Sequence, residues 1–148
     1  MKIPLIKKLD IPDIINTASQ LPQDGRLAIS HNQLVYLDID DRYIHTLFPL
    51  LKNASIQKPD YFGEKSGGAH ISVVYPEEKM VINKKDFGKT HQFTIKEMVA
   101  VTIKEKIYYA LLVKSPSLLD LRRQYGLSNL LNFKGYAIEF HITIGVKK

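Results

Sequence analysis

Two short segments of this chain share one pattern: a histidine, an apolar residue, a hydroxyl residue and a second apolar residue. They are His70-Ile71-Ser72-Val73 and His141-Ile142-Thr143-Ile144. Successive side chains of a β-strand point to opposite faces of its sheet. The pattern therefore predicts two strands that each present a base and a hydroxyl on one face and apolar side chains on the other.

This doubled pattern is uncommon for the composition. The sequence has five histidines and 45% apolar residues, and two such motifs arise by chance in roughly 0.4% of comparable chains. A single motif would describe a half-buried histidine beside a strand-favouring serine or threonine. The pair favours one functional site, with two structural histidines as the alternative.

Length and composition limit the class of protein. A chain of 148 residues with 45% apolar and 24% charged residues predicts one soluble globular domain, residues 1–148, with a hydrophobic core. The absence of cysteine excludes disulfides, thiolate catalysis and cysteine-ligated zinc. No apolar run approaches about 18 residues, and lysines interrupt the first eight residues. We therefore expect a cytoplasmic protein without membrane contact. The oligomeric state is open, with a monomer as the expectation.

The charge balance favours an anionic partner. Lys and Arg number 21 and Asp and Glu 15, a net charge of +6, and the isoelectric point is near 9.4. Such a surface attracts nucleic acid through phosphate contacts and electrostatic steering. The lysines are scattered rather than clustered, so a solvated basic surface explains the charge equally well.

Residues 1–25 are expected to form a helical extension, because Asp10 precedes a segment with Pro12 in its first turn and apolar residues at helical spacing. Strands are then expected at residues 26–30 and 33–39. The turn between them holds His31, which we interpret as a turn residue rather than a catalyst.

A second helix is expected after the aspartates at positions 40 and 41, either of which can act as its N-cap. Pro49 should kink or interrupt this helix. His45 falls on its polar side, so we interpret His45 as a surface residue.

The residues before the first motif read as a loop, 53–68, with several glycines. Tyr61, Phe62 and Lys65 are suited to closing over a nucleotide, since aromatic rings stack on bases and the following Ser66-Gly67-Gly68 allows close backbone approach. The alternative is that the two aromatic side chains cover the core and the glycines make a turn.

The second half of the chain repeats this order of elements. Three strands are expected, at residues 92–95, 98–103 and 107–113. Ser115 and Pro116 then begin a helix that Gly126 can end. A short loop, 128–134, leads towards the second motif.

The two halves thus share the order strand, capped helix, loop and histidine strand. The fold class we predict is α+β, with mostly antiparallel sheets in two lobes, residues 26–76 and 92–146. A pseudo-twofold axis between the lobes would bring the two motifs face to face across a central groove.

The motifs at His70 and His141 resemble the paired H-x-[S/T]-x motifs of the two-histidine (2H) phosphoesterase superfamily, which includes LigT-like RNA phosphodiesterases. The resemblance loosely covers residues 26–146 and implies the same two-lobed architecture. It implies that His70 and His141 are the catalytic acid and base and that Ser72 and Thr143 bind the phosphate, with no metal and no cofactor. The family often has threonine where this chain has Ser72, but the hydroxyl is kept.

Elementary chemistry supports this implication. Cleaving a phosphodiester requires one group that accepts a proton from the attacking oxygen and another that donates one to the leaving oxygen. Imidazoles suit both tasks because their ordinary pKa is about 6.5. The sequence offers no H-x-x-x-H zinc pattern, no G-x-S-x-G nucleophile elbow and no phosphate-binding glycine loop.

The leading hypothesis is a metal-independent phosphodiesterase that acts on a 2′,3′-cyclic phosphate at an RNA end, or on a related 2′-linked or cyclic oligonucleotide. Two alternatives stay open. One is a non-catalytic RNA- or nucleotide-binding module with the same groove. The other is a basic structural protein in which both histidines pack in the sheet.

Overall fold

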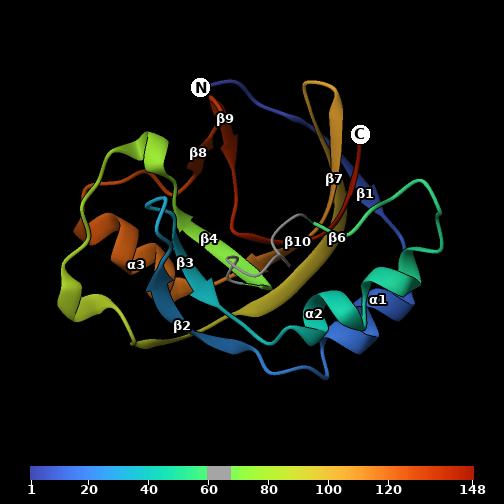
Figure 1. Ribbon diagram of the computed structural model, residues 1–148, viewed down its shortest axis with the longest axis horizontal. Coiled ribbons are helices and arrows are strands. Elements are labelled where there is room, and N and C mark those ends of the chain that lie inside the picture. Colours follow the sequence, from blue (N-terminus) through green and yellow to red (C-terminus); the bar gives the residue numbers. More distant parts are fainter. Residues whose placement is uncertain (60–67) are drawn as a thin grey trace.

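The fold is an α+β arrangement around one large antiparallel sheet, as Figure 1 shows for this computed structural model. The structure describes residues 1–59 and 68–148. The candidate substrate-loop residues Tyr61, Phe62 and Lys65 lie outside the described residues. The α+β class predicted from the sequence is confirmed.

The strands are β1 (Leu5–Leu9), β2 (Asp24–Ile29), β3 (Val35–Asp38), β4 (His70–Val74), β5 (Thr90–Gln92), β6 (Thr94–Ile103), β7 (Lys106–Lys114), β8 (Leu131–Phe133), β9 (Tyr136–Ile138) and β10 (His141–Lys147). The α-helices are α1 (Pro12–Ala18), α2 (Arg42–His45) and α3 (Pro116–Gln124), and short 3-10 helices are η1 (Phe48–Leu51), η3 (Pro76–Glu78) and η4 (Lys84–Asp86). Among the described residues, none of the helices is long and apolar enough to cross a membrane.

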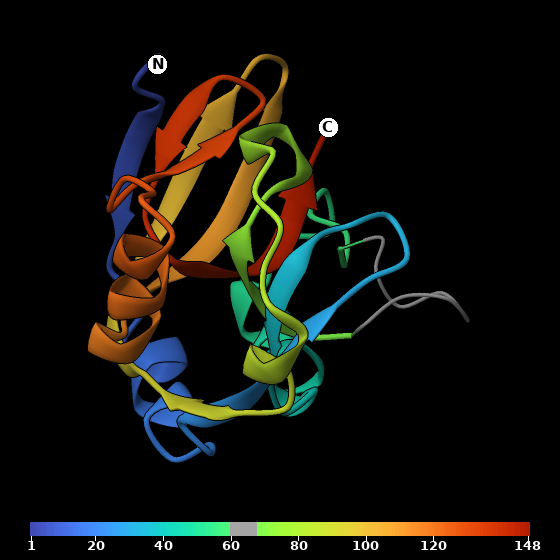
Figure 2. The same cartoon turned by 90° about the vertical axis from the view of Figure 1, so that its left-hand side faces the viewer.

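The large sheet has the strand order β1-β6-β7-β10-β4-β3-β2-β5, with antiparallel neighbours throughout. Both predicted histidine motifs form strands, β4 and β10, and these two strands are neighbours at the centre of the sheet. Figures 1 and 2 show that the sheet is strongly curved, so that β3 and β4 lie across from β6 and β7 instead of extending in one plane.

The apolar positions of both motifs lie in the hydrophobic core. Ile71, Val73, Ile142 and Ile144 are each 0% exposed. The period of two in the sequence therefore predicted correctly which side chains of each strand are buried. Burying four such side chains is a strong reason for the register of both strands to be fixed.

Local signals placed several elements correctly. Pro12 begins α1, Pro49 lies at the start of η1 instead of inside a continuous helix, and Gly126 follows α3 with a φ of 72°. Ser115 caps α3, since its Oγ accepts a hydrogen bond from the Leu118 amide at 3.4 Å. The predicted turn at His31 joins β2 and β3, and His45 is exposed.

Three parts of the chain differ from the prediction. The two strands expected at residues 92–95 and 98–103 form the single strand β6. Residues 1–25 hold not only helix α1 but also β1, an edge strand whose largely exposed side chains give no alternating pattern in the sequence. Residues 128–134 are not simply a loop, because they include β8, which pairs with β9 as a separate hairpin. Its turn uses Lys134 and Gly135, both with positive φ.

A buried arginine holds the end of β4 in place. Arg122 of α3 is 0% exposed, and its guanidinium donates to the Glu78 carboxylate at 2.7 and 2.9 Å. It also donates to the carbonyl oxygens of Val73, Ser128 and Leu130 at 2.8 to 3.0 Å. A buried guanidinium is tolerated only when its donors are satisfied in this way. The network thus ties β4 to α3 and to the segment that leads into β8.

Candidate active site

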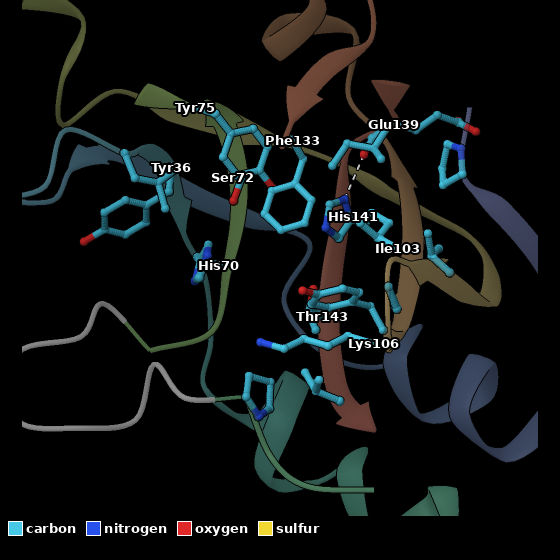
Figure 3. Close-up of a pocket in the computed structure, with 18 of the residues that line it drawn as sticks. Tyr36, His70, Ser72, Tyr75, Ile103, Lys106, Phe133, Glu139, His141 and Thr143 are labelled. Atoms are coloured by element: carbon cyan, nitrogen blue, oxygen red, sulfur yellow. Dashed lines mark hydrogen bonds between the residues drawn. The ribbon is translucent and has the colours of Figure 1, made fainter. Parts of the chain in front are cut away.

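Both motifs open onto one cavity of about 680 Å³. Its lining includes His70 and Ser72 from β4 and His141 and Thr143 from β10. All four predicted site residues are therefore brought together, although they are 71 positions apart in the sequence from one histidine to the other. Figure 3 shows the four side chains projecting from neighbouring strands into the same space.

The strand register crosses the two motifs over. β4 and β10 are antiparallel and pair at Ile71 and Ile142. From this pair the register aligns each histidine with the hydroxyl residue of the other motif. Figure 3 shows Ser72 on β4 near the level of His141 on β10, and His70 below Ser72 on the side of Thr143. A phosphate between the strands would meet an imidazole and a hydroxyl from each side.

Each histidine is held by the same backbone interaction. The Nδ1 atom of His70 lies 2.9 Å from the Gly68 carbonyl oxygen, and that of His141 lies 2.8 Å from the Glu139 carbonyl oxygen. A carbonyl oxygen can only accept, so Nδ1 carries the hydrogen in both rings. In the neutral ring Nε2 is then the atom that accepts a proton. Because the acceptors are backbone atoms, no residue type in the sequence marks them.

Asp41 and Gly68 fix the carbonyl that orients His70. The Ala69 amide donates to Asp41 Oδ1 at 3.0 Å, and Gly68 has a φ of 75°, a conformation that glycine adopts at little cost. A Cβ at Gly68 would also collide with the Asp41 carboxylate. Asp41 occupies the N-cap position of α2 but makes no side-chain capping bond there. The Asp41 carboxylate, predicted as a possible helix cap, thus holds the backbone at Ala69, immediately before His70.

The pKa values of both histidines are lowered, chiefly by burial, which disfavours the charged ring. The hydrogen bonds to the Gly68 and Glu139 carbonyls act in the opposite direction. Asp38, the cross-strand neighbour of His70, also raises the pKa of His70, whereas the charge of His70 lowers the pKa of His141. Two charged imidazoles are therefore disfavoured unless an anion binds between them.

Aromatic side chains form a wall beside the histidines. The rings of Tyr36 and His70 meet edge to face, with centroids 5.5 Å apart. The Phe133 ring lies 5.1 Å from that of Tyr75 and 5.8 Å from that of Tyr108. Burial raises the pKa of Tyr75, which is also hydrogen-bonded to the side chain of Ser72. These aromatic residues come from segments far apart in the chain, so no local sequence pattern marked them.

Two further residues that line the cavity, His31 and Lys106, were not predicted to be site residues. His31, predicted to be a turn residue, lies in the turn and also lines the cavity. Lys106 of β7 extends its amine into the cavity below Thr143 in Figure 3. His45 and His91 are not among the lining residues. Within residues 1–59 and 68–148, no group of three or more His, Asp or Glu side chains is placed to hold a metal ion.

A comparison with protein families identifies the family of this chain. The family model described as the Swiss Army Knife 2H phosphoesterase domain matches residues 35–148. The chain belongs to the 2H phosphoesterase family. This confirms the resemblance predicted from the two motifs, and it places the chain in a family of phosphoester hydrolases. No curated protein and no solved structure matches the chain.

The half-buried histidines of the site predict a pH dependence of stability. Because the pKa of His141 is lower in the folded 2H phosphoesterase than in the unfolded chain, the unfolded state binds more protons below about pH 6.5. The free energy of unfolding should therefore be highest above about pH 6.5. It should decrease as the pH falls from there through the lower pKa of the folded state. The decrease amounts to about 1.4 kcal/mol for each pH unit that separates the two pKa values.

Urea unfolding between about pH 5.5 and about pH 8 measures this effect. We expect His141→Gln to flatten the pH dependence, because it removes the titrating ring. Parallel curves for wild type and His141→Gln would show that His141 does not titrate abnormally.

Proposed function

We propose that this 2H phosphoesterase hydrolyses a 2′,3′-cyclic phosphate at an RNA end, or a related 2′-linked or cyclic oligonucleotide, without a metal ion. The observation that carries the proposal is the matched pair of imidazoles, each held through Nδ1 to a carbonyl oxygen, which makes Nε2 the proton-accepting atom of the neutral ring. The net charge of +6 supports an anionic substrate. We also propose that the two predicted lobes, residues 26–76 and 92–146, are related by a pseudo-twofold axis across a central groove.

In this mechanism one neutral histidine accepts a proton at Nε2 from water, and the water oxygen forms a bond to phosphorus. The bond from phosphorus to the ribose 2′- or 3′-oxygen breaks, and the other, protonated histidine donates its Nε2 proton to that leaving oxygen. The phosphate itself favours the protonated ring, because its charge offsets the burial that lowers both pKa values.

Ser72 and Thr143 are proposed to donate hydrogen bonds to the non-bridging phosphate oxygens, where charge develops in the transition state. The crossed register sets one hydroxyl beside each histidine, so both sides of the phosphorus meet a donor. Thr143 is half-buried, whereas Ser72 is 6% exposed and engaged with Tyr75.

Turnover in excess EDTA tests the proposed function, using nucleoside 2′,3′-cyclic phosphates, 2′-5′ oligoadenylates and cyclic dinucleotides. We expect hydrolysis of at least one substrate, and we expect His70→Ala and His141→Ala each to lower the rate on the order of 10²–10⁴-fold. His45→Ala and His91→Ala should retain wild-type rates, because neither histidine lines the cavity.

Three results would contradict this proposal. One is loss of turnover in EDTA that a divalent ion restores. Another is a rate near that of wild type for a folded His70→Ala or His141→Ala variant. The third is tight binding of these nucleotides without any turnover, which would identify a non-catalytic binding module.

The role of Thr143 is tested by Thr143→Val, which keeps the branched shape and the strand preference but removes the hydroxyl. We expect kcat/KM to fall by about one to two orders of magnitude, because a hydrogen bond to a charged group contributes roughly 1.5–3 kcal/mol. The pH profile of the rate should change little. Thr102→Val is the matched control, a half-buried threonine of β6 that does not line the cavity. A Thr143→Val rate within about twofold of wild type would make Thr143 structural.

A further inference from the structure

Part of the cavity wall comes from residues that the family match does not include. The match begins at residue 35, whereas Ile3, Pro4 and Ile6 all line the cavity. The N-terminal strap, defined here as residues 2–6, therefore lies outside the matched part of the chain and lines its candidate active site.

The strap is anchored at both ends. At one end the Lys2 amide donates to the Gly135 carbonyl oxygen at 2.9 Å, and the Ala137 amide donates to the Lys2 carbonyl oxygen at 2.8 Å. At the other end β1 pairs with β6, beginning at Leu5 and Thr102. Figure 1 shows the chain crossing from the β8–β9 hairpin to the edge of the sheet. The strap thus connects two elements that both border the cavity.

The strand register places the strap side chains beside the aromatic wall. Ile6 pairs with Val101 of β6, and Val101 pairs with Tyr108 of β7, so these three side chains lie on one face of the sheet. The Tyr108 ring contacts Phe133, whose ring also contacts Tyr75. One continuous apolar and aromatic surface therefore runs from the strap towards the histidine strands.

The strap presents apolar surface that the core does not use. Ile3 is 86% exposed and Ile6 46% exposed, although both face the cavity, while Val101 behind them is 9% exposed. Figure 3 shows Ile103, on the same wall, on the far side of His141 from His70. A ligand with its phosphate between the histidines would extend a flat apolar group over this surface. The component of a nucleotide that has this character is the base.

We infer that the N-terminal strap is the far wall of a nucleobase subsite, so that the substrate binds with one base enclosed between the strap and the aromatic residues. The inference rests on the proposed function for the position of the phosphate. It narrows the substrate to a phosphodiester whose reacting phosphate belongs to a nucleoside with an intact base. Base recognition here depends on residues outside the matched family domain.

The test compares the double variant Ile3→Ser/Ile6→Ser with Leu5→Ser. Leu5 belongs to the same segment and is 73% exposed, but it does not line the cavity. The substrates are adenosine 2′,3′-cyclic phosphate and ethylene phosphate, a cyclic diester without ribose or base. Binding of adenosine 2′-monophosphate, measured by calorimetry, provides a readout that does not require turnover.

We expect the double variant to lower kcat/KM for the adenosine substrate by about tenfold, mainly through KM, and to weaken nucleotide binding by a similar factor. Ethylene phosphate should be hydrolysed as by wild type, and Leu5→Ser should match wild type throughout. Nucleotide binding that depends on Ile3 and Ile6 without any turnover would support the subsite while refuting the proposed function. The inference is overturned if wild type binds no nucleotide, if the double variant behaves as wild type, or if both substrates lose activity equally.

Discussion

The pairing of Ile71 with Ile142 is the constraint on which the site depends. Both side chains are completely buried, and they are the point where β4 pairs with β10. A shift of either strand by one residue would turn its histidine and hydroxyl into the core and its isoleucine into the cavity. Such a shift would expose large apolar side chains and bury imidazoles without partners, so hydrophobic burial enforces the alignment of the polar residues. The packing of the hydrophobic core therefore determines which face of each strand carries the histidine and the hydroxyl.

Polar interactions then restrict the parts of the site that burial leaves free. Apolar packing determines which face each imidazole occupies but not how the ring is turned about its bonds. The carbonyl oxygens of Gly68 and Glu139 supply that orientation, and Asp41 supports the backbone around the former. Arg122 and Glu78 form an ion pair at the other end of β4. The same guanidinium donates to the carbonyl oxygens of Val73 and Leu130, which holds β4 against α3 and against the residues before the β8–β9 hairpin. Fixed donors and acceptors of this kind lower the reorganisation needed during proton transfer.

The sequence predicted what is encoded locally. The alternation around His70 and His141, the proline at the start of α1 and the Ser115 cap each depend on neighbouring residues, and all three are confirmed. What it did not predict depends on register or on backbone atoms. Tyr108 reaches Phe133 only because strands far apart in the chain are brought together, and strand β1 is stabilised by its partner β6 instead of by a pattern of its own. Of the two aspartates predicted as possible caps, Asp41 holds the N-cap position of α2 but accepts a hydrogen bond from the distant Ala69 amide, while Asp40 accepts from the Arg42 amide.

The orientation of the two imidazoles is the central claim, and nitrogen-15 NMR of histidine-labelled protein measures it most directly. At about pH 8 the ring nitrogen shifts distinguish a proton on Nδ1 from one on Nε2. The account predicts the Nδ1–H form for both His70 and His141, in contrast to an exposed ring such as His45, and it predicts that inorganic phosphate perturbs Nε2 of both. The Nε2–H form in either histidine, or phosphate binding that leaves both Nε2 shifts unchanged, would contradict the proposed acid and base pair.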